Sequence, residues 1–325
     1  MKLNFFSKVF CAKKVDRKEV WWYNSSKFNL RRNAMKTVKL IPATKDHVWG
    51  GNKLRDYNKQ SSDDKIAESW ELSFHKDGLC KTEDGQNLCD VVSKEDLGTN
   101  CLAFDFFPVL TKFIDAKENL SVQVHPNDEF ALKNENSYGK TEVWYVVDAD
   151  EGAGIYWGWE KDITKDEFLQ AVENNTLTSL LHFEKVEKGG SYFIPSGTVH
   201  AIAKGCLIYE IQQNSNITYR IYDYGRGRQL HLDKALLVSD FSKWKRQEFD
   251  EGIIAKCEYF DARVLDVDGS YTTSADEKSF VAFTIVEGKG EIDGQTAIAG
   301  DSFFTPANTP SIVLSGKMKV ITVRI

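Results

Sequence analysis

The chain has 325 residues, of which 42% are hydrophobic and 28% are charged, a composition that allows a large core and excludes a low-complexity chain. Its formal net charge of −6 gives no overall attraction to nucleic acid or to an anionic membrane surface. No apolar run approaches the roughly 18 residues that a membrane-spanning helix needs. The six cysteines include no C-x-x-C pair, and we interpret them as reduced thiols of a cytoplasmic protein.

Basic residues are concentrated at the amino terminus. Residues 1–34 contain nine lysines and arginines and two acidic residues, so this segment carries +7 and the rest of the chain −13. Apolar residues between the lysines would suit a targeting or membrane-surface segment, but Lys8 interrupts them and the stretch is too short for a signal peptide. We expect a basic extension that is disordered or lies upstream of a start at Met35.

Short apolar runs separated by Gly, Asn and Asp turns dominate the chain after Met35. Their close spacing predicts strands of a sandwich or barrel rather than alternating strands and helices. The clearest runs before residue 230 are 106–114, 120–124, 141–147, 189–195, 206–213 and 217–224. The predicted fold class is therefore mainly β.

Two segments interrupt the strands with a helical pattern. Within 162–183, Thr164 and Glu167 form a capping box, and the apolar residues that follow recur at helical spacing. Residues 230–246 have the composition of a second helical stretch followed by a linker. We therefore expect a small helical insertion between two sets of strands.

The strand pattern resumes after about residue 250, and one phrase there repeats an earlier one. AGDSFFTPANTP, which contains Pro306, resembles KGGSYFIPSGTVH, which contains Pro195. When the two prolines are aligned, Ser311 falls at the position of His200. The repeat predicts two related β-barrels, of which only the first has kept its polar chemistry.

Three short motifs of the first barrel contain residues that could bind a metal. Residues two apart on a strand share a face, so Gln123 and His125 project together. Glu142 lies on a separate strand, where a buried carboxylate is costly unless a cation compensates it. His200 follows a Pro-x-Gly turn. Each residue alone could be structural, but together they supply four nitrogen and oxygen ligands for Zn²⁺ or another divalent metal.

The same motifs resemble a known family. Gly189 to His200 fits the second cupin signature, G-x5-P-x-G-x2-H. LSVQVHPND, GKTEVWYV, IPSGTVHAI and IQQNSNITYRIYDYGR, with VWGG and ESWELSFH before them, closely resemble type I mannose-6-phosphate isomerases of the shorter bacterial form. The match spans about residues 36–226. It implies two cupin (jelly-roll) domains, a catalytic one over 35–246 with the helical insertion and a metal-free one over 247–325.

The resemblance also implies a role for individual residues. One zinc ion would be bound by Gln123, His125, Glu142 and His200. Arg220 falls at an essential arginine beside the pocket, Lys140 at a lysine that contacts substrate, and Glu210 at a carboxylate close to the site. From the residues alone, Arg220 could instead form a surface ion pair with Asp223, and Lys140 could be a solvated turn lysine.

The implied reaction interconverts mannose 6-phosphate and fructose 6-phosphate by proton transfer between C2 and C1 through an enediol(ate). It requires a Lewis acid, a base and a cationic recess for the phosphate, and the base is left open between Glu210 and Lys140.

Two other hypotheses are an iron-dependent cupin dioxygenase and a metal-containing bicupin that binds a sugar or metabolite without catalysis. Gln123 and Arg220 count against the first. Lys140, Glu210 and Arg220 beside the ligands count against the second. The oligomeric state is left open.

Overall fold

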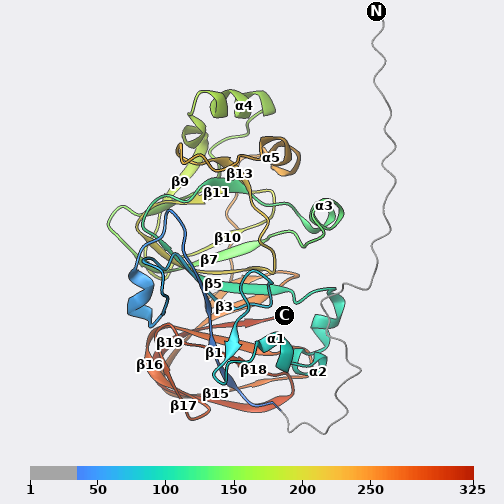
Figure 1. The fold of residues 1–325 in the computed structure, drawn as a ribbon, viewed down its shortest axis with the longest axis vertical. Coiled ribbons are helices and arrows are strands. Elements are labelled where there is room, and N and C mark those ends of the chain that lie inside the picture. Colours follow the sequence, from blue (N-terminus) through green and yellow to red (C-terminus); the bar gives the residue numbers. More distant parts are fainter. Residues whose placement is uncertain (1–34) are drawn as a thin grey trace, which may run out of the picture.

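The computed structural model describes residues 35–325, and the predicted basic extension over residues 1–34 lies outside the described part. The described fold is mainly β, as predicted, with its strands in three sheets. The strands pair antiparallel, and helix α4 (Lys165–Glu173) and the C-terminal strands lie at opposite ends of the molecule (Figure 1). Within these residues no helix is long and apolar enough to cross a membrane.

The central sheet has six strands in the order β10-β7-β12-β5-β3-β2. These are β2 (Ala43–Lys45), β3 (Glu68–Leu72), β5 (Val109–Ala116), β7 (Glu142–Ala149), β10 (Ser191–Ile194) and β12 (Cys206–Gln213). Every residue of β3, β5 and β12 is buried, because this sheet is covered on both faces. A strand buried on both faces explains the continuous apolar runs in the sequence.

The outer sheet has five strands in the order β13-β6-β11-β8-β9. These are β6 (Val122–Val124), β8 (Gly154–Trp159), β9 (Leu181–Lys185), β11 (His200–Ile202) and β13 (Tyr219–Tyr222). Ile114, Trp144 and Ile208 of the central sheet share one apolar cluster with Ile155 and Trp157 of the outer sheet. The two sheets therefore face each other and form the first barrel.

Three helices cover the other face of the outer sheet: α3 (Asp128–Asn134), α4 (Lys165–Glu173) and α5 (Leu232–Val238). The capping box of Thr164 and Glu167 is present at the start of α4, as predicted. The helical insertion is shorter than predicted, because only α4 and a 3-10 turn (Leu177–Leu180) lie within 162–183. The apolar residues after that turn form β9, which pairs with β8.

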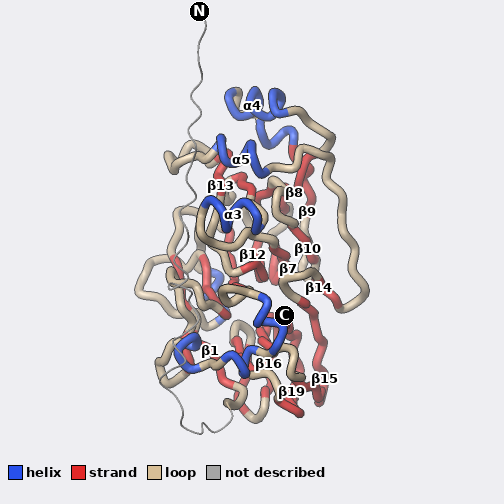
Figure 2. Tube along the Cα trace, turned by 90° about the vertical axis from the view of Figure 1, so that its right-hand side faces the viewer, coloured by secondary structure: helices blue, strands red, loops and turns tan. Residues whose placement is uncertain are grey.

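The C-terminal sheet has the order β14-β15-β19-β16-β18-β1-β4, with β17 paired to β16. Its strands are β1 (Val38–Ile41), β4 (Lys81–Thr82), β14 (Ile253–Lys256), β15 (Asp261–Ala275), β16 (Val281–Ile292), β17 (Gln295–Ile298), β18 (Ser302–Thr305) and β19 (Thr309–Arg324). Two of them, β1 and β4, come from the amino-terminal part of the chain, and Figure 2 shows β1 beside the C-terminal strands. In space, two amino-terminal strands therefore complete the sheet of the C-terminal half, across the expected boundary at residue 247.

The internal repeat is visible in the backbone. Gly189 and Gly300 have φ of 89° and 96°, and the aligned positions Gly197 and Asn308 have φ of 87° and 61°. These values lie in the left-handed region, which glycine and asparagine tolerate best. A Cβ atom at Gly300 would lie 2.0 Å from the carbonyl oxygen of Tyr57, so only glycine fits there. The two phrases therefore form the same turn in both barrels.

Short elements complete the connections. They are α1 (Leu88–Val91), α2 (Lys94–Leu97) and the 3-10 turns η3 (Lys53–Tyr57) and η4 (Thr99–Ala103). Ser93 and Asp96 form a capping box at the start of α2. The turn η4 connects to the C-terminal half, because the backbone N–H groups of Thr99 and Asn100 donate to carbonyl groups of residues 277 and 278.

Candidate active site

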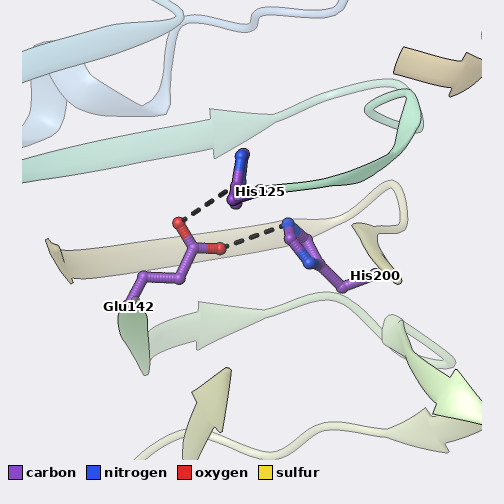
Figure 3. Close-up of side chains that lie close together, drawn as sticks. All are labelled: His125, Glu142 and His200. Atoms are coloured by element: carbon purple, nitrogen blue, oxygen red, sulfur yellow. Dashed lines mark ion pairs between the residues drawn. The ribbon is translucent and has the colours of Figure 1, made fainter. Parts of the chain in front are cut away.

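Three ligand-type side chains converge inside the first barrel (Figure 3). Glu142 begins β7, His200 begins β11, and His125 directly follows β6. His200 Nε2 lies 3.3 Å from Glu142 Oε1, and His125 Nε2 lies 3.8 Å from Glu142 Oε2. One ligand atom from each residue lies within 4.8 Å of the other two, and all three residues are buried. We call His125, Glu142 and His200 the triad.

Backbone carbonyl groups fix the two imidazole rings. His125 Nδ1 donates to the Ile217 oxygen at 2.7 Å, and His200 Nδ1 donates to the Thr198 oxygen at 2.8 Å. A neutral ring that donates from Nδ1 keeps the lone pair of Nε2 for a ligand. Burial lowers the pKa of His200 to about 4 and the pKa of His125 well below 6.5, so both rings are neutral. The triad histidines therefore have the tautomer that a metal requires.

The carboxylate of Glu142 supports the same interpretation. Neither of its oxygens has a hydrogen-bond partner among the described residues, and burial together with Glu210 raises its pKa to about 7. The Lys140 ammonium lies 2.5 Å from Oε2, without hydrogen-bond geometry, and 3.3 Å from His125 Nε2. The triad thus already attracts a positive charge, and its two nitrogens and carboxylate fit a divalent metal.

Gln123, the fourth predicted ligand, lies beside the triad. It is directly opposite His200 in the sheet, and its Nε2 is 3.4 Å from His200 Nε2. Val122 and Val124 pack on the opposite face, against the helices, as the strand alternation predicted. The geometry places Gln123 within reach of a metal held by the triad, and its role as a ligand stays a prediction.

Five buried charged side chains form a row next to the triad. In order they are Glu68, Lys112, Glu210, Lys140 and Glu142, and successive charged atoms lie 3.7, 3.0, 3.5 and 2.5 Å apart. Each lysine therefore lies between two carboxylates, which is how buried charges are tolerated. Burial alone would raise the pKa of Glu210, but Lys112 and Lys140 outweigh it and lower the pKa to about 2. We call these residues the charge row.

Sequence reasoning missed two members of the charge row, Lys112 and Glu68. Lys112 stands in the middle of the apolar run 106–114, and a lysine in a buried strand needs a carboxylate partner. A lysine within this apolar run was therefore the sequence signal for a buried charge that needs a partner. The sequence signal for Glu68 was weaker, because only its spacing of two residues from Trp70 suggests a shared face. In the structure, Glu68 accepts a hydrogen bond from the Trp70 indole N–H at 2.7 Å.

A cavity of about 130 Å³, the inner cavity, opens beside the triad. The charged residues in its lining are four cations and two carboxylates: Lys112, Lys140, Arg220, Arg228, Glu68 and Glu210. His47 and Arg228 also line an outer cleft of about 350 Å³, so the two spaces share a wall. The excess of cations suits an anionic ligand.

Arg220 has free donor groups in this cavity. Its Nη1 donates to the Gln229 oxygen at 3.0 Å, while its buried Nε has no hydrogen-bond partner among residues 35–325. Asp223, the alternative partner considered from the sequence, pairs with Arg228 at 2.5 Å. No ion pair of Arg220 occurs in the described part of the chain. The guanidinium is therefore available to an anion.

Comparison with protein families gives two matches. Residues 37–152 match the catalytic domain of type I phosphomannose isomerase. Residues 251–325 match the cupin domain of mannose-6-phosphate isomerase. The first range includes three of the four predicted metal ligands, and the second covers most of the C-terminal sheet.

Individual relatives agree with the family matches. Mannose-6-phosphate isomerase ManA of Bacillus subtilis is 34% identical over 304 residues, which are 86% of this chain and 96% of the relative. The crystal structure of the Bacillus subtilis mannose 6-phosphate isomerase has a TM-score of 0.82 at 32% identity, over 90% of this chain and 100% of that one. A mannose 6-phosphate isomerase bound with zinc and yttrium shares the fold, with a TM-score of 0.72 at 16% identity over 89% and 99% of the two chains. The chain belongs to the type I mannose-6-phosphate isomerase family, with its cupin fold.

Proposed function

We propose that this chain is a zinc-dependent aldose–ketose isomerase that interconverts mannose 6-phosphate and fructose 6-phosphate. A proton moves between C2 and C1 through an enediol(ate). The observation that carries the proposal is the buried triad beside a cavity lined by four cations and two carboxylates. We infer the substrate from the relatives, which are named as mannose-6-phosphate isomerases. A cytoplasmic location stays a prediction.

The metal would be held by His125, Glu142 and His200, with Gln123 as the fourth ligand. The two Glu142 oxygens, which accept no hydrogen bond among the described residues, and the neutral rings support a single divalent ion there. When bound, zinc supplies a Lewis acid that stabilises the oxyanion developing on the sugar. Another divalent metal with the same ligand preference would serve the same purpose.

The phosphate would be bound by Arg220 and Arg228. Arg220 presents unused guanidinium donors to the inner cavity, and a planar guanidinium matches two phosphate oxygens. Arg228 lines both the inner cavity and the outer cleft, so it lies where an extended substrate would enter. Asp223 fixes Arg228 through two hydrogen bonds, from Nε at 2.8 Å and from Nη2 at 2.5 Å.

Proton transfer is assigned to Glu210 and Lys140 as a pair. Trp144 Nε1 donates to Glu210 Oε2 at 2.9 Å, and Lys112 and Lys140 flank Oε1 at 3.0 and 3.5 Å. With a pKa of about 2, Glu210 by itself is a weak base near neutral pH. The Lys140 ammonium lies 3.5 Å from Glu210 Oε1, close enough for the two groups to act together in moving a proton between C2 and C1.

A coupled assay of fructose 6-phosphate formation from mannose 6-phosphate tests the proposal. Metal-loaded protein should turn over this substrate, and kcat/KM for unphosphorylated mannose should be about a hundredfold lower, because the charge-assisted hydrogen bonds to phosphate are lost. Tight binding of mannose 6-phosphate without turnover would instead favour the non-catalytic bicupin. Consumption of O₂ would favour the dioxygenase.

A further inference from the structure

One face of the central sheet lines the inner cavity, and the other packs against the C-terminal sheet. On β12, Glu210 faces the inner cavity, while its neighbour Tyr209 faces the C-terminal sheet. Tyr209 and Phe113 share one apolar cluster with Phe304 and Ile321 of the C-terminal sheet. The C-terminal half of the molecule therefore packs directly behind the strands that carry the charge row.

A continuous chain of polar contacts crosses this interface. Tyr209 Oη and Thr284 Oγ1 are 2.7 Å apart, Thr284 Oγ1 and Ser302 Oγ are 2.9 Å apart, and Ser302 Oγ donates to Glu71 Oε2 at 2.8 Å. Glu71 also forms an ion pair with Lys59 at 2.8 Å. All five residues are at most 4% exposed. We call them the interface polar chain.

Glu71 occupies an irregular position on β3. The pairing of β3 with β5 shifts register between Trp70 and Leu72, so Glu71 is the extra residue of a β-bulge. Bulges bend a strand and change the direction of neighbouring side chains. The neighbour here is Trp70, whose indole N–H donates to Glu68 at 2.7 Å, at one end of the charge row. A shift of the bulge would therefore move that end.

Groups from both halves of the molecule hold the Glu71 carboxylate. Ser69 donates to it at 2.7 Å from the same strand, and Ser302 donates from β18. Lys59 donates to Glu71 and also to the carbonyl oxygen of Gly300. A fully buried ion pair adds little net stability, because desolvation offsets its attraction, and its better attested use is to fix one geometry.

We propose that the C-terminal sheet positions the residues of the reaction through Thr284 and Ser302. Thr284 holds Tyr209, which is next to Glu210, and Ser302 holds Glu71, which is next to Trp70. Neither hydroxyl touches the inner cavity, so both are positioning residues. The proposal rests on the proposed isomerase function and goes beyond it by giving the C-terminal barrel a part in turnover.

The test compares Thr284→Val and Ser302→Ala with wild-type protein loaded with zinc. Both variants should bind one zinc per chain and keep KM, while kcat falls about tenfold, because small displacements of reacting groups are costly. Thr284→Ser, which keeps the hydroxyl, should restore kcat. Thr305→Val is the matched control, because Thr305 is a buried hydroxyl of the same sheet that bonds Thr37 at 2.9 Å, away from the central sheet. The kcat of Thr305→Val should stay at the wild-type value, even if its melting temperature falls as much as that of Thr284→Val or Ser302→Ala.

A double-mutant cycle tests the contact from the other side. Tyr209→Phe should also lower kcat, and the double variant should be no slower than Thr284→Val alone, because Thr284→Val already removes the contact between Tyr209 and Thr284. Unchanged kcat in Thr284→Val and Ser302→Ala, additive losses in the double variant, or an equal loss in Thr305→Val would overturn the positioning role alone. Absent turnover in the zinc-loaded wild type would overturn the proposed function and this role with it.

Discussion

The triad histidines are oriented and kept neutral by separate features of their surroundings. Backbone carbonyl groups orient the rings, and burial keeps His125 and His200 unprotonated. Arg220 has a different position, because its free guanidinium donors lie in the cavity and not in the triad. The site therefore separates residues that would hold metal from one that would hold substrate.

This separation predicts that two alanine variants differ in whether they lose zinc as well as turnover. His200→Ala should lose both zinc and turnover, because it removes one of the triad nitrogens. Arg220→Ala should keep zinc and lose turnover on the order of a hundredfold, because only substrate positioning is removed. Elemental analysis and the coupled assay measure the two quantities. His182→Ala is the control, because His182 pairs with Glu160 on the outside of the barrel. A fully loaded and active His200→Ala variant would contradict the site.

The buried histidines also predict how pH changes the stability of the metal-free protein. The pKa of His200 falls from 6.5 to about 4 on folding because of burial. Below pH 6.5 the unfolded chain therefore binds a proton that the folded chain does not bind until about pH 4. The free energy of unfolding should decrease as pH falls through this window, and His200 should contribute no pH dependence above it.

Urea unfolding of the metal-free protein at pH 7.5, 6 and 5 measures this effect. His200→Gln serves as the control, because it removes the titrating ring and should make the decrease smaller. A free energy of unfolding that falls equally in both proteins would show that His200 is protonated in the folded state.

Much of the site at this scale could be predicted from the sequence, because His125 and His200 lie in short local motifs. Lys112 and Glu68 could not be placed in the same way. Their function depends on the pairing of β3, β5 and β12, which are far apart in the sequence. A charge in a buried strand indicates that a partner exists, but only the sheet order identifies the partner.

At the scale of elements, local sequence signals predicted where a helix begins, but strand pairing could not be predicted from the sequence. The capping box placed the start of α4 correctly, because it depends on residues three apart. The end of the helical insertion was wrong, because residues 181–185 gain strand hydrogen bonds from β8 that no local pattern announces. The pairing of β1 with β18 joins residues about 260 positions apart and was equally invisible.

The cap of α4 predicts a stability change without a functional one. Thr164→Ala should lower the free energy of unfolding by about 1 kcal/mol, because the Glu167 N–H loses its acceptor. Turnover should be unchanged, since α4 packs on the helix-covered face of the outer sheet. Chemical unfolding and the coupled assay check both parts. A fall in kcat at full zinc occupancy would show that α4 influences the site.

At the scale of the whole molecule, the two barrels share structure. One apolar cluster contains Phe113 and Tyr209 of the central sheet and Phe304 and Ile321 of the C-terminal sheet. β1 and β4 complete the C-terminal sheet from the other end of the chain. The division into domains over 35–246 and 247–325 stays a prediction from the sequence, and the pairing of β1 and β4 with the C-terminal strands crosses it.

Shared structure predicts that the two barrels unfold together. Calorimetry of the metal-free protein should give a single transition, because unfolding either barrel exposes the common cluster, and unfolding the C-terminal sheet also removes β18 from β1. A chain that ends at residue 246 should not fold, because β18, one of the two strand partners of β1, and the C-terminal part of the common cluster are missing. Two separate transitions, or a folded chain of residues 35–246, would contradict this.

Zinc titration of the metal-free protein, followed by the coupled isomerase assay, tests the central claim most directly. We expect no turnover without metal, and activity that rises in proportion to zinc and reaches its maximum at one equivalent per chain. Undiminished turnover in the metal-free protein, or one equivalent of bound zinc with no turnover of mannose 6-phosphate, would contradict it.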